Sequence, residues 1–293
     1  MNNEGSTILV TGATGTVGGE VVRQLSAKGQ IGIRAAARSA NNPTLKDLKS
    51  VEIVELDYNK PETLATAFKD VNKLFLLTPF QSDMLDLTSN LVNAAKKSGV
   101  KYIIKQSVMG ALWEPGITPG RLHRQAEKII EESGIPFSFL RPNVFMQNFV
   151  NFYSPMIKSQ GALYAPAGDG KVSFVDVRDI AAVAVQALIN DNQHKGKAYN
   201  ITGPEVLSYG QTAEILSREL GKEIKYVNIP DEDARKGMKD MGMDDWSANS
   251  IIELFDITRK GYASDISSVV EELTGRKPIS FSQFVEDYAE AFR

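Results

Sequence analysis

The sequence lacks cysteine entirely, and its 293 residues include only two histidines, His123 and His194. The absence of cysteine excludes disulfides, thiolate nucleophiles, thiolate zinc sites and iron–sulfur clusters. Two histidines are too few for a histidine-rich metal site, and they do not have the spacing of a metalloprotease helix. We therefore predict a protein without a metal, whose chemistry comes from another source.

Long apolar runs and a strong charge of one sign are also missing. No run approaches the roughly 20 apolar residues of a membrane span, and the short polar segment Met1–Ser6 does not resemble a secretory signal. The formal net charge is -3, and Lys and Arg form no cluster that could hold a phosphate backbone. We expect a cytoplasmic protein that binds neither membranes nor nucleic acids directly, in an oligomeric state that the sequence does not indicate.

The first half of the chain alternates short apolar runs with amphipathic stretches, which is the pattern of βαβ units around a parallel sheet. The predicted strands are Thr7–Thr11, Gly32–Ala37, Val51–Glu55, Lys73–Leu77, Tyr102–Lys105 and Phe137–Leu140. We predict an α/β fold, with a Rossmann doubly wound parallel sheet and a smaller, mostly helical C-terminal substrate lobe. Residues 1–153 and 172–201 are assigned to the nucleotide-binding domain, and residues 154–171 and 202–293 to the lobe.

Local signals predict two further features in the second half of the chain. A hairpin is expected with strands at Leu163–Ala165 and Val172–Val175 and a tip at Gly168–Gly170. Asp179 is expected to cap a helix over Ile180–Leu188, because a carboxylate accepts the free N–H groups of a first turn. Both expectations rest on a few neighbouring residues, without any constraint from the rest of the chain.

A glycine-rich segment, TGATGTVG, follows the first predicted strand and opens the next predicted helix. Its three glycines allow a tight turn that brings the backbone close to a pyrophosphate, and the helix that follows directs its free N–H groups and positive dipole end at the phosphates. The predicted cofactor-binding positions in this loop are Gly12, Thr14, Gly15, Thr16, Val17 and Gly18. An ordinary glycine-rich turn is the alternative, but the place of the loop at the head of a βαβ series favours dinucleotide binding.

This loop and three later segments, LRPNVFMQNF, AGDGKVSFVDVRDIAAVA and ITGPEVLSYGQTAEIL, resemble the short-chain dehydrogenase/reductase superfamily in its extended and atypical branches. The chain is most similar to the NmrA-like family, and the resemblance covers nearly all of it. Bacterial NAD(P)H:quinone oxidoreductases and triphenylmethane reductases of this branch look alike in the same places. The resemblance implies a nicotinamide dinucleotide as the cofactor.

The end of the second predicted strand bears on the choice between NADP(H) and NAD(H). Rossmann proteins that prefer NAD usually carry an Asp or Glu there, which binds the ribose 2′-hydroxyl. This chain has Arg38 instead, and a guanidinium can pair with a 2′-phosphate. NADP(H) is therefore favoured over NAD(H), with an ordinary solvated charge at Arg38 as the alternative. Arg34 is a weaker second candidate.

The ends of the third and fourth predicted strands supply further cofactor positions. The resemblance places Asp57, followed by Tyr58, beside the adenine, and a turn-forming aspartate is the alternative. Thr78 and Pro79 follow the fourth strand, where ligands of open parallel sheets bind. We expect both residues to pass close to a ribose of the cofactor.

Most active members of the superfamily carry Tyr-x-x-x-Lys on the helix after the fifth strand and a serine on that strand. By this resemblance Ser107 keeps the serine. Ala126 and Glu127 match the residues that follow the lysine, which puts His123 at the lysine position and Pro119 at the tyrosine position. The dyad is therefore absent, which argues against oxidation of a sugar alcohol, because that reaction needs a strong positioned base.

His123 is predicted to hold the nicotinamide ribose or to donate a proton near neutral pH, and Ser107 is the second predicted catalytic residue. A histidine that only caps or covers its helix is the alternative. Lys105, on the fifth strand near Ser107, is a weak further candidate for a group facing the cofactor. Hydride transfer remains feasible without the dyad, because the cofactor itself carries the difficult step.

The predicted substrate residues are Asn143, Phe145, Gln147 and Phe149, which follow the sixth strand. Aromatic side chains suit a flat apolar substrate, although such spacing also indicates core packing. The resulting hypothesis is an NAD(P)H-dependent oxidoreductase that reduces a small aromatic, quinone-like or imine-like acceptor. The alternative is a non-catalytic NADP(H)-binding redox sensor of the NmrA type, and the extended lobe after Thr202 favours the enzyme.

Overall fold

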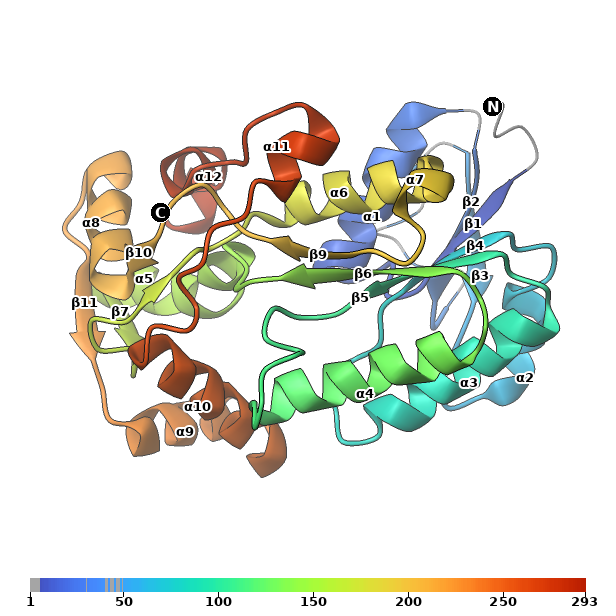
Figure 1. Ribbon diagram of the computed structural model, residues 1–293. Helices are drawn as coiled ribbons and strands as arrows, with labels where there is room; N and C mark the ends of the chain where they lie inside the picture. The colour runs from blue at the N-terminus through green and yellow to red at the C-terminus, as the bar shows by residue number, and fades with distance from the viewer. Residues whose placement is uncertain (1–5, 30, 40–41, 43–44, 46–47, 49) are drawn as a thin grey trace. The chain divides into compact units, whose positions relative to one another are not determined.

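The computed structural model describes residues 6–29, 31–39, 42, 45, 48 and 50–293 (Figure 1). The chain forms two compact units, one of Met1–Arg141 with Ile180–Asn200 and one of Pro142–Asp179 with Ile201–Arg293. These boundaries differ from those of the predicted domains, because residues 142–153 and 172–179 belong to the second unit.

A seven-stranded sheet forms the centre of the first unit, in the order β3-β2-β1-β4-β5-β6-β9. The strands are β1 (Thr7–Val10), β2 (Gly32–Ala37), β3 (Val51–Glu55), β4 (Lys73–Leu76), β5 (Tyr102–Gln106), β6 (Phe137–Pro142) and β9 (Ala198–Ile201). The pairs from β3 through β6 are parallel, and the central strands β4 and β5 are buried along their whole length. The predicted doubly wound sheet is confirmed, since strands buried on both faces need the continuous apolar runs seen in the sequence.

Helices cover both faces of this sheet (Figure 1). They are α1 (Thr16–Lys28), α2 (Pro61–Ala67), α3 (Met84–Lys97), α4 (Thr118–Glu132), α6 (Val177–Ile189) and α7 (Asp191–His194). One core cluster joins Leu74 and Ile103 of the sheet to Leu91 of α3 and Ile130 of α4. The α3–α4 side of β5 is therefore the face on which Ile103 lies, and alternate residues of β5 share that face.

The second unit is mostly helical, as predicted. Its elements are the π-helix η1 (Phe149–Tyr153), α5 (Ser154–Gln160), β7 (Ala162–Ala165), β8 (Lys171–Val172), β10 (Leu207–Ser208), α8 (Tyr209–Leu220), β11 (Lys225–Asn228), α9 (Asp231–Asp240), α10 (Asp245–Arg259), α11 (Val269–Thr274), α12 (Phe281–Asp287) and the 3₁₀-helix η2 (Ala289–Ala291). Its core is rich in aromatic rings, with Phe149 packed against Phe174 and Phe281. Ser208 caps α8 in a capping box with Gln211.

The predicted hairpin at Leu163–Ala165 and Val172–Val175 is wrong. β7 pairs in parallel with β11, and β8 pairs antiparallel with β10, so each strand finds its partner far away in the sequence. Gly170, between them, serves close packing, because a Cβ there would lie 2.5 Å from the carbonyl oxygen of Thr258. Turn residues alone could not reveal these distant partners.

The predicted helix cap at Asp179 is also wrong. α6 begins at Val177, and the carboxylate of Asp176, the residue before it, accepts the N–H of Arg178 at 2.7 Å. Asp179 instead lies in the first turn, where its carboxylate pairs with Arg276 at 2.5 Å and accepts the N–H of Ile279 at 2.8 Å. The helix therefore begins three residues earlier than the sequence pattern indicated.

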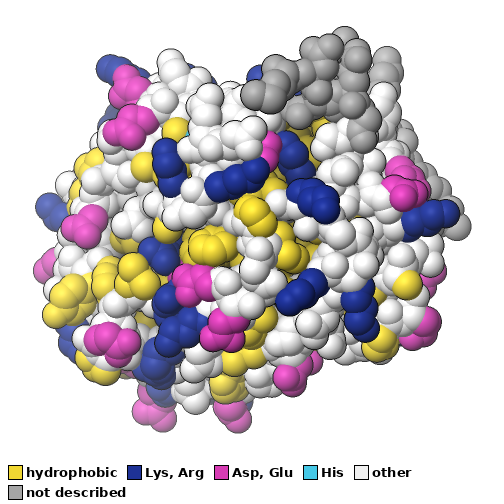
Figure 2. Space-filling view, turned by 45° about the vertical axis from the view of Figure 1, so that its right-hand side comes forward, with side chains coloured by type: hydrophobic (Ala, Val, Ile, Leu, Met, Phe, Trp, Pro, Cys, Tyr) yellow, Lys and Arg dark blue, Asp and Glu magenta, His cyan; other side chains and the backbone are white. Residues whose placement is uncertain are grey.

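The surface of the described part of the chain carries charges of both signs. Figure 2 shows Lys and Arg side chains beside Asp and Glu side chains over much of the visible face, which agrees with a formal net charge of only -3. Among the described helices, none combines the length and the apolar composition needed to cross a bilayer.

Candidate functional site

The glycine-rich loop joins β1 to α1 in a tight turn. Gly12 has a φ of +65°, a left-handed conformation that glycine adopts without a steric penalty, and its carbonyl oxygen accepts the N–H of Gly15 at 2.9 Å. A Cβ at Gly18 would lie 2.2 Å from that same carbonyl oxygen. The first turn of α1 can therefore pack on the loop only because position 18 carries no side chain.

The start of α1 offers backbone donors to an anion. Gly15 occupies the N-cap without a capping side chain, and the first turn contains no acidic residue. Thr14, Gly15 and Thr16 are exposed, whereas the side chain of Val17 is buried. An uncapped helix start with its positive dipole end in solvent is the arrangement that binds phosphate groups.

The loop is fixed to the end of β4 by Thr11. Its hydroxyl donates to the carbonyl oxygen of Leu77 at 2.9 Å and accepts the N–H of Leu77 at 2.8 Å. The hydroxyl of Tyr58, after β3, donates to the same carbonyl oxygen at 2.9 Å, and burial raises the pKa of that phenol. These contacts tie the ends of β1, β3 and β4 together at the edge where open sheets bind ligands.

The two candidate arginines of β2 lie in different surroundings. Arg34 is fully engaged, because it pairs with Glu52 at 2.9 Å and donates to the carbonyl oxygens of Ala67 and Lys69. Arg38 follows the last residue of β2, is exposed, and makes no hydrogen bond or ion pair with a described residue. Of the two, only Arg38 has a guanidinium that no described residue engages.

Asp57 takes part in the turn that the alternative interpretation expected. Its Oδ1 accepts the N–H of Asn59 at 3.0 Å, and its Oδ2 lies 3.9 Å from the Nζ of Lys60. The side chain is half-buried at the carboxyl end of β3. The turn occupies one carboxylate oxygen, so a contact between Asp57 and an adenine stays a prediction.

Three buried polar atoms at the carboxyl ends of β4 and β5 have no hydrogen-bond partner in the described part of the chain. They are the Oγ1 of Thr78, the Oε1 of Gln106 and the Oγ of Ser107. Leu76 is paired with Lys105 in the sheet, so Thr78 and Ser107 both stand two residues beyond the same rung. A buried hydroxyl normally has a hydrogen-bond partner. Neighbouring unsatisfied hydroxyls at this edge, together with the loop, fit a bound dinucleotide.

His123 lies on the face of α4 that is directed at the sheet, together with Pro119, Ala126 and Glu127. Only 8% of its surface is exposed, and its Nδ1 lies 3.5 Å from the Nζ of Lys105 on β5. Burial and the neighbouring ammonium lower the pKa of His123 well below the usual value. His123 is therefore neutral at physiological pH and does not behave as a helix-surface histidine.

Lys105 was only a weak candidate in the sequence, yet it is the group closest to His123. Its Nζ donates to the carbonyl oxygen of Gln106 at 2.6 Å, and burial lowers its pKa to about 8 against the opposing charge of Glu127. The signal in the sequence was a lysine inside an otherwise buried strand, two residues before Ser107. Such a lysine has to lie on the same face as that serine.

Glu127, on the next turn of α4, is completely buried and holds an ion-pair network. Both of its oxygens bind the guanidinium of Arg141, at 2.8 Å and 2.7 Å, and Arg124 donates to one of them at 3.2 Å. The bidentate geometry compensates the desolvation of the carboxylate. Glu127 thus anchors α4 to β6, and this contact fixes the position of His123 relative to the sheet.

The predicted substrate residues lie in the second unit, and three of them are engaged there. Asn143 donates to Ser173 at 2.7 Å and to the carbonyl oxygen of Ala263 at 2.8 Å. Gln147 donates to Asp176 at 3.0 Å and accepts the N–H of Val177 at 2.9 Å. The two phenylalanines differ in their burial. The ring of Phe149 is buried in the aromatic core, and Phe145 is half-buried. A contact with a substrate stays a prediction for all four.

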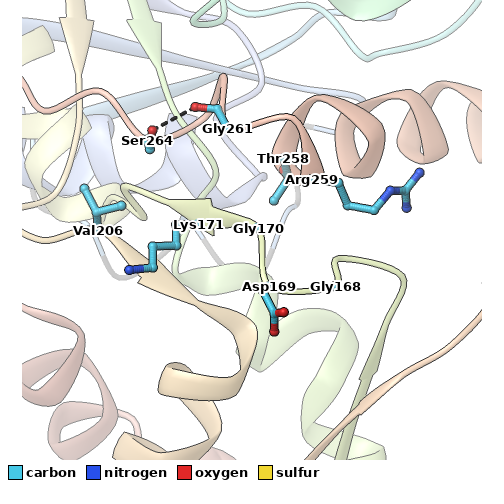
Figure 3. A pocket seen from close by; sticks show the side chains of 9 residues that line it. All are labelled: Gly168, Asp169, Gly170, Lys171, Val206, Thr258, Arg259, Gly261 and Ser264. Atoms are coloured by element: carbon cyan, nitrogen blue, oxygen red, sulfur yellow. Dashed lines mark hydrogen bonds between the residues drawn. The ribbon is translucent and has the colours of Figure 1, made fainter.

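A separate hollow lies within the second unit (Figure 3). Its volume is about 660 Å³, and it is lined by Gly168, Asp169, Gly170, Lys171, Val206, Thr258, Arg259, Gly261 and Ser264. None of the predicted site residues is among them. The guanidinium of Arg259 is bound to Asp231 at 2.7 Å, which leaves Lys171 and Asp169, of opposite charge, as the remaining charged groups. This hollow carries no recognisable set of reacting groups.

Nearly the whole chain is similar to known proteins. A family model described as the NmrA-like family matches residues 4–285. The NAD(P)H azoreductase of Xenophilus azovorans is 36% identical over 285 residues, which span 97% of this chain and 99% of that protein. Two similar solved structures are complexes with a dinucleotide. The Escherichia coli NADPH-dependent quinone oxidoreductase with NADPH has a TM-score of 0.84 at 27% identity and covers 96% of this chain and 99% of its own. The Citrobacter triphenylmethane reductase with NADP(H) has a TM-score of 0.83 at 29% identity, with coverages of 96% and 99%.

Proposed function

Because the chain belongs to the NmrA-like family, we propose that it is an NADPH-dependent oxidoreductase that reduces a small aromatic acceptor, such as a quinone, an imine or an azo compound. The observation that carries this proposal is the set of groups found at the carboxyl edge of the sheet in the first unit. There the glycine-rich loop stands at the same edge as two buried hydroxyls, those of Thr78 and Ser107, that have no hydrogen-bond partner among the described residues. When bound, the dinucleotide supplies the hydride.

The residues of the first unit would hold the cofactor in separate parts. The backbone of the Gly12–Gly18 loop and the start of α1 would bind the pyrophosphate. Thr78 and Pro79 would lie along a ribose, and the cofactor would give the Oγ of Ser107 a hydrogen-bond partner, which no described residue supplies. His123, held neutral by burial, is the proposed donor at the reacting end.

Preference for NADPH over NADH rests on Arg38. An exposed arginine directly after β2, without a partner among the described residues, offers a planar pair of donors to a 2′-phosphate. No carboxylate occupies the position that would bind a free 2′-hydroxyl, because Ala37 and Ser39 flank the arginine. The complexes of the quinone oxidoreductase and the triphenylmethane reductase with NADPH and NADP(H) support the same choice.

The proposed class of acceptor rests on the absence from α4 of the tyrosine that activates an alcohol in related enzymes. Pro119 stands at the position of the tyrosine that activates an alcohol, and it has no group that can take a proton. An electron-poor quinone, imine or azo bond accepts a hydride without such a base and then needs only one proton from a weak donor. The azoreductase and quinone oxidoreductase names of the relatives agree with this chemistry.

The test begins with fluorescence titrations of the protein with NADPH and NADH. Loss of nicotinamide absorbance is then followed with a quinone, an azo dye, a cationic triarylmethane dye and an imine. We expect tighter binding of NADPH and turnover with at least one acceptor. Tight binding without oxidation by any acceptor of the panel would overturn the proposal and favour the non-catalytic sensor.

A further inference from the structure

Lys105 is an unusual residue for the interior of a sheet. None of its surface is exposed, and burial of an ammonium group is costly unless the charge is compensated. Lys105 makes no ion pair with a described residue. Within the described part of the chain, its Nζ has two hydrogen-bond partners, the carbonyl oxygen of Gln106 at 2.6 Å and the Nδ1 of His123 at 3.5 Å. His123 of α4 is thus one of two polar groups that compensate the buried charge of Lys105.

Lys105 lies on β5 two residues before Ser107, which belongs to the proposed site. Lys105 and Ser107 share the α4 face of β5, because residues two apart in a strand point to the same side. The titratable or charged groups on the elements packed over this face are His123 and Glu127 of α4 and Arg141 of β6, whereas β4 and α3 contribute apolar side chains. Glu127 is already bound to Arg141, so the imidazole is the acceptor left for the ammonium.

We propose that Lys105 is a positioning residue that donates to Nδ1 of His123, keeps the proton of the neutral ring on Nε2, and gives a proton to Nδ1 when Nε2–H passes to the reduced acceptor. This inference rests on the proposed function. The proton balance is complete: Nε2 releases one proton to the anion left by hydride transfer, and Nδ1 takes one from the Nζ of Lys105. Water then returns a proton to Nε2 while Nδ1 gives its proton back to the Nζ, which restores both groups. No further oxidant or reductant is needed.

The electrostatics support this assignment of charges. Burial and the ammonium lower the pKa of His123 well below its usual value, while burial lowers the pKa of Lys105 to about 8. Near pH 7 the lysine therefore carries the proton and the ring is neutral. A neutral imidazole alone is a very weak acid, but gain of a proton at Nδ1 while Nε2 loses one keeps the ring uncharged. The pair would thus supply protons where the tyrosine and lysine of related enzymes are missing.

The ring itself can be observed directly. The chain has only two histidines, so ¹⁵N-histidine NMR of the free protein gives two ring patterns, which a His194→Gln variant assigns. We expect His123 to show an N–H at Nε2 and an acceptor nitrogen at Nδ1, and to resist protonation at acid pH. A proton on Nδ1 in the wild-type protein would overturn the proposal without recourse to any variant.

Lys105→Met tests the coupling, with Lys73→Met as the matched control. Lys73 is also a buried lysine, on the neighbouring strand β4, but it binds Asp191 and the carbonyl oxygen of Leu188. We expect Lys105→Met to raise the pKa of His123 and to abolish its fixed tautomer, and Lys73→Met to change neither. Thermal unfolding of both variants verifies that they are folded.

Turnover supplies the second readout. With an active acceptor, kcat of the wild-type protein should fall as the pH rises through the pKa of Lys105, about 8. Lys105→Met should lower kcat at least about 10-fold, remove this pH dependence, and leave the Kd of NADPH within about threefold. An unchanged His123 ring and unchanged kcat in folded Lys105→Met would overturn the role of Lys105 alone. Absence of turnover in the wild-type protein would overturn the proposed function and the proton transfer together.

Discussion

Gly18→Ala is the substitution for which the structure gives the sharpest expectation. A Cβ at this position would lie 2.2 Å from the carbonyl oxygen of Gly12, 2.6 Å from its carbonyl carbon and 3.0 Å from the nitrogen of Ala13. All three are backbone atoms of the loop, so no side chain can move aside. Relief to about 3 Å requires a displacement on the order of 0.8 Å between the helix and the loop, which is the overpacking that costs about 1–3 kcal/mol.

The same displacement should weaken cofactor binding. Charge-assisted hydrogen bonds from the loop to a phosphate contribute about 1.5–3 kcal/mol each, so loss of one raises the Kd of NADPH about 10- to 100-fold. The matched control is Gly19→Ala, whose Cβ would meet only the carbonyl oxygen of Ala13, at 3.2 Å. Alanine also favours a helix by about 1 kcal/mol over glycine, so Gly19→Ala should be near neutral in stability.

Fluorescence titration with NADPH and thermal unfolding measure both effects on the two variants. We expect Gly18→Ala to lose affinity and to unfold several degrees lower, since about 1 kcal/mol corresponds to roughly 2–4 °C in a domain of this size. Wild-type affinity and stability in Gly18→Ala would refute the packing argument. Equal losses in both variants would also refute it, because the loss would then come from α1 in general and not from the contact with Gly12.

Three further expectations follow from other parts of the chain. Arg38→Gln should weaken NADPH binding about 10-fold or more and leave NADH binding unchanged. The control variant Arg34→Gln should change neither affinity. If the Arg38 variant binds NADPH as tightly as the wild-type protein, Arg38 does not belong to the site. Gly237→Ala on α9 meets no atom within 4 Å and should raise the free energy of unfolding by about 1 kcal/mol in a denaturant titration, and a lower value would show that glycine is required there. The pKa of Lys105 in the folded protein, about 8, lies below its ordinary value, so the unfolded chain binds more protons between about pH 8 and 10 and this group adds stability as the pH rises. The stability of wild type relative to Lys105→Met should therefore increase over that window, and a flat difference would show that the lysine has an ordinary pKa.

The sequence predicted the sheet well because each strand there is specified by its own residues. A run such as Tyr102–Gln106, buried on both faces, needs no distant partner to be recognised. The prediction failed for β7 and β8, whose partners β11 and β10 lie far along the chain. Gly170, which was expected at a hairpin tip, instead allows close contact with Thr258 of α10. Such pairings depend on the tertiary fold and leave no local pattern.

In the candidate site, too, features specified by neighbouring residues could be predicted, and features that depend on distant partners could not. The glycine loop could be recognised because its spacing reflects a steric demand within eight residues, TGATGTVG. The partner of His123 could not, because the distance between Lys105 and His123 depends on how α4 is seated on β5 by the ion pair of Glu127 with Arg141. Whether Asn143 and Gln147 bind a substrate or brace the second unit likewise depended on their partners, and the structure gives each of them two internal hydrogen bonds.

The loss of the tyrosine and lysine on α4 changes where protons can come from, but it does not leave the site without a source. By the resemblance to the superfamily, Pro119 and His123 stand at these two helix positions, and Lys105 of the neighbouring strand β5 lies beside His123. A strand lysine is held by the rigid sheet and cannot swing out to solvent, so its charge acts on the imidazole in one fixed geometry. A donor of this kind is too weak to activate an alcohol, yet sufficient for an acceptor that becomes strongly basic only after it has taken the hydride. The chemistry of the first unit is therefore matched to easily reduced acceptors, and activity toward simple secondary alcohols should be absent even where NADPH binds tightly.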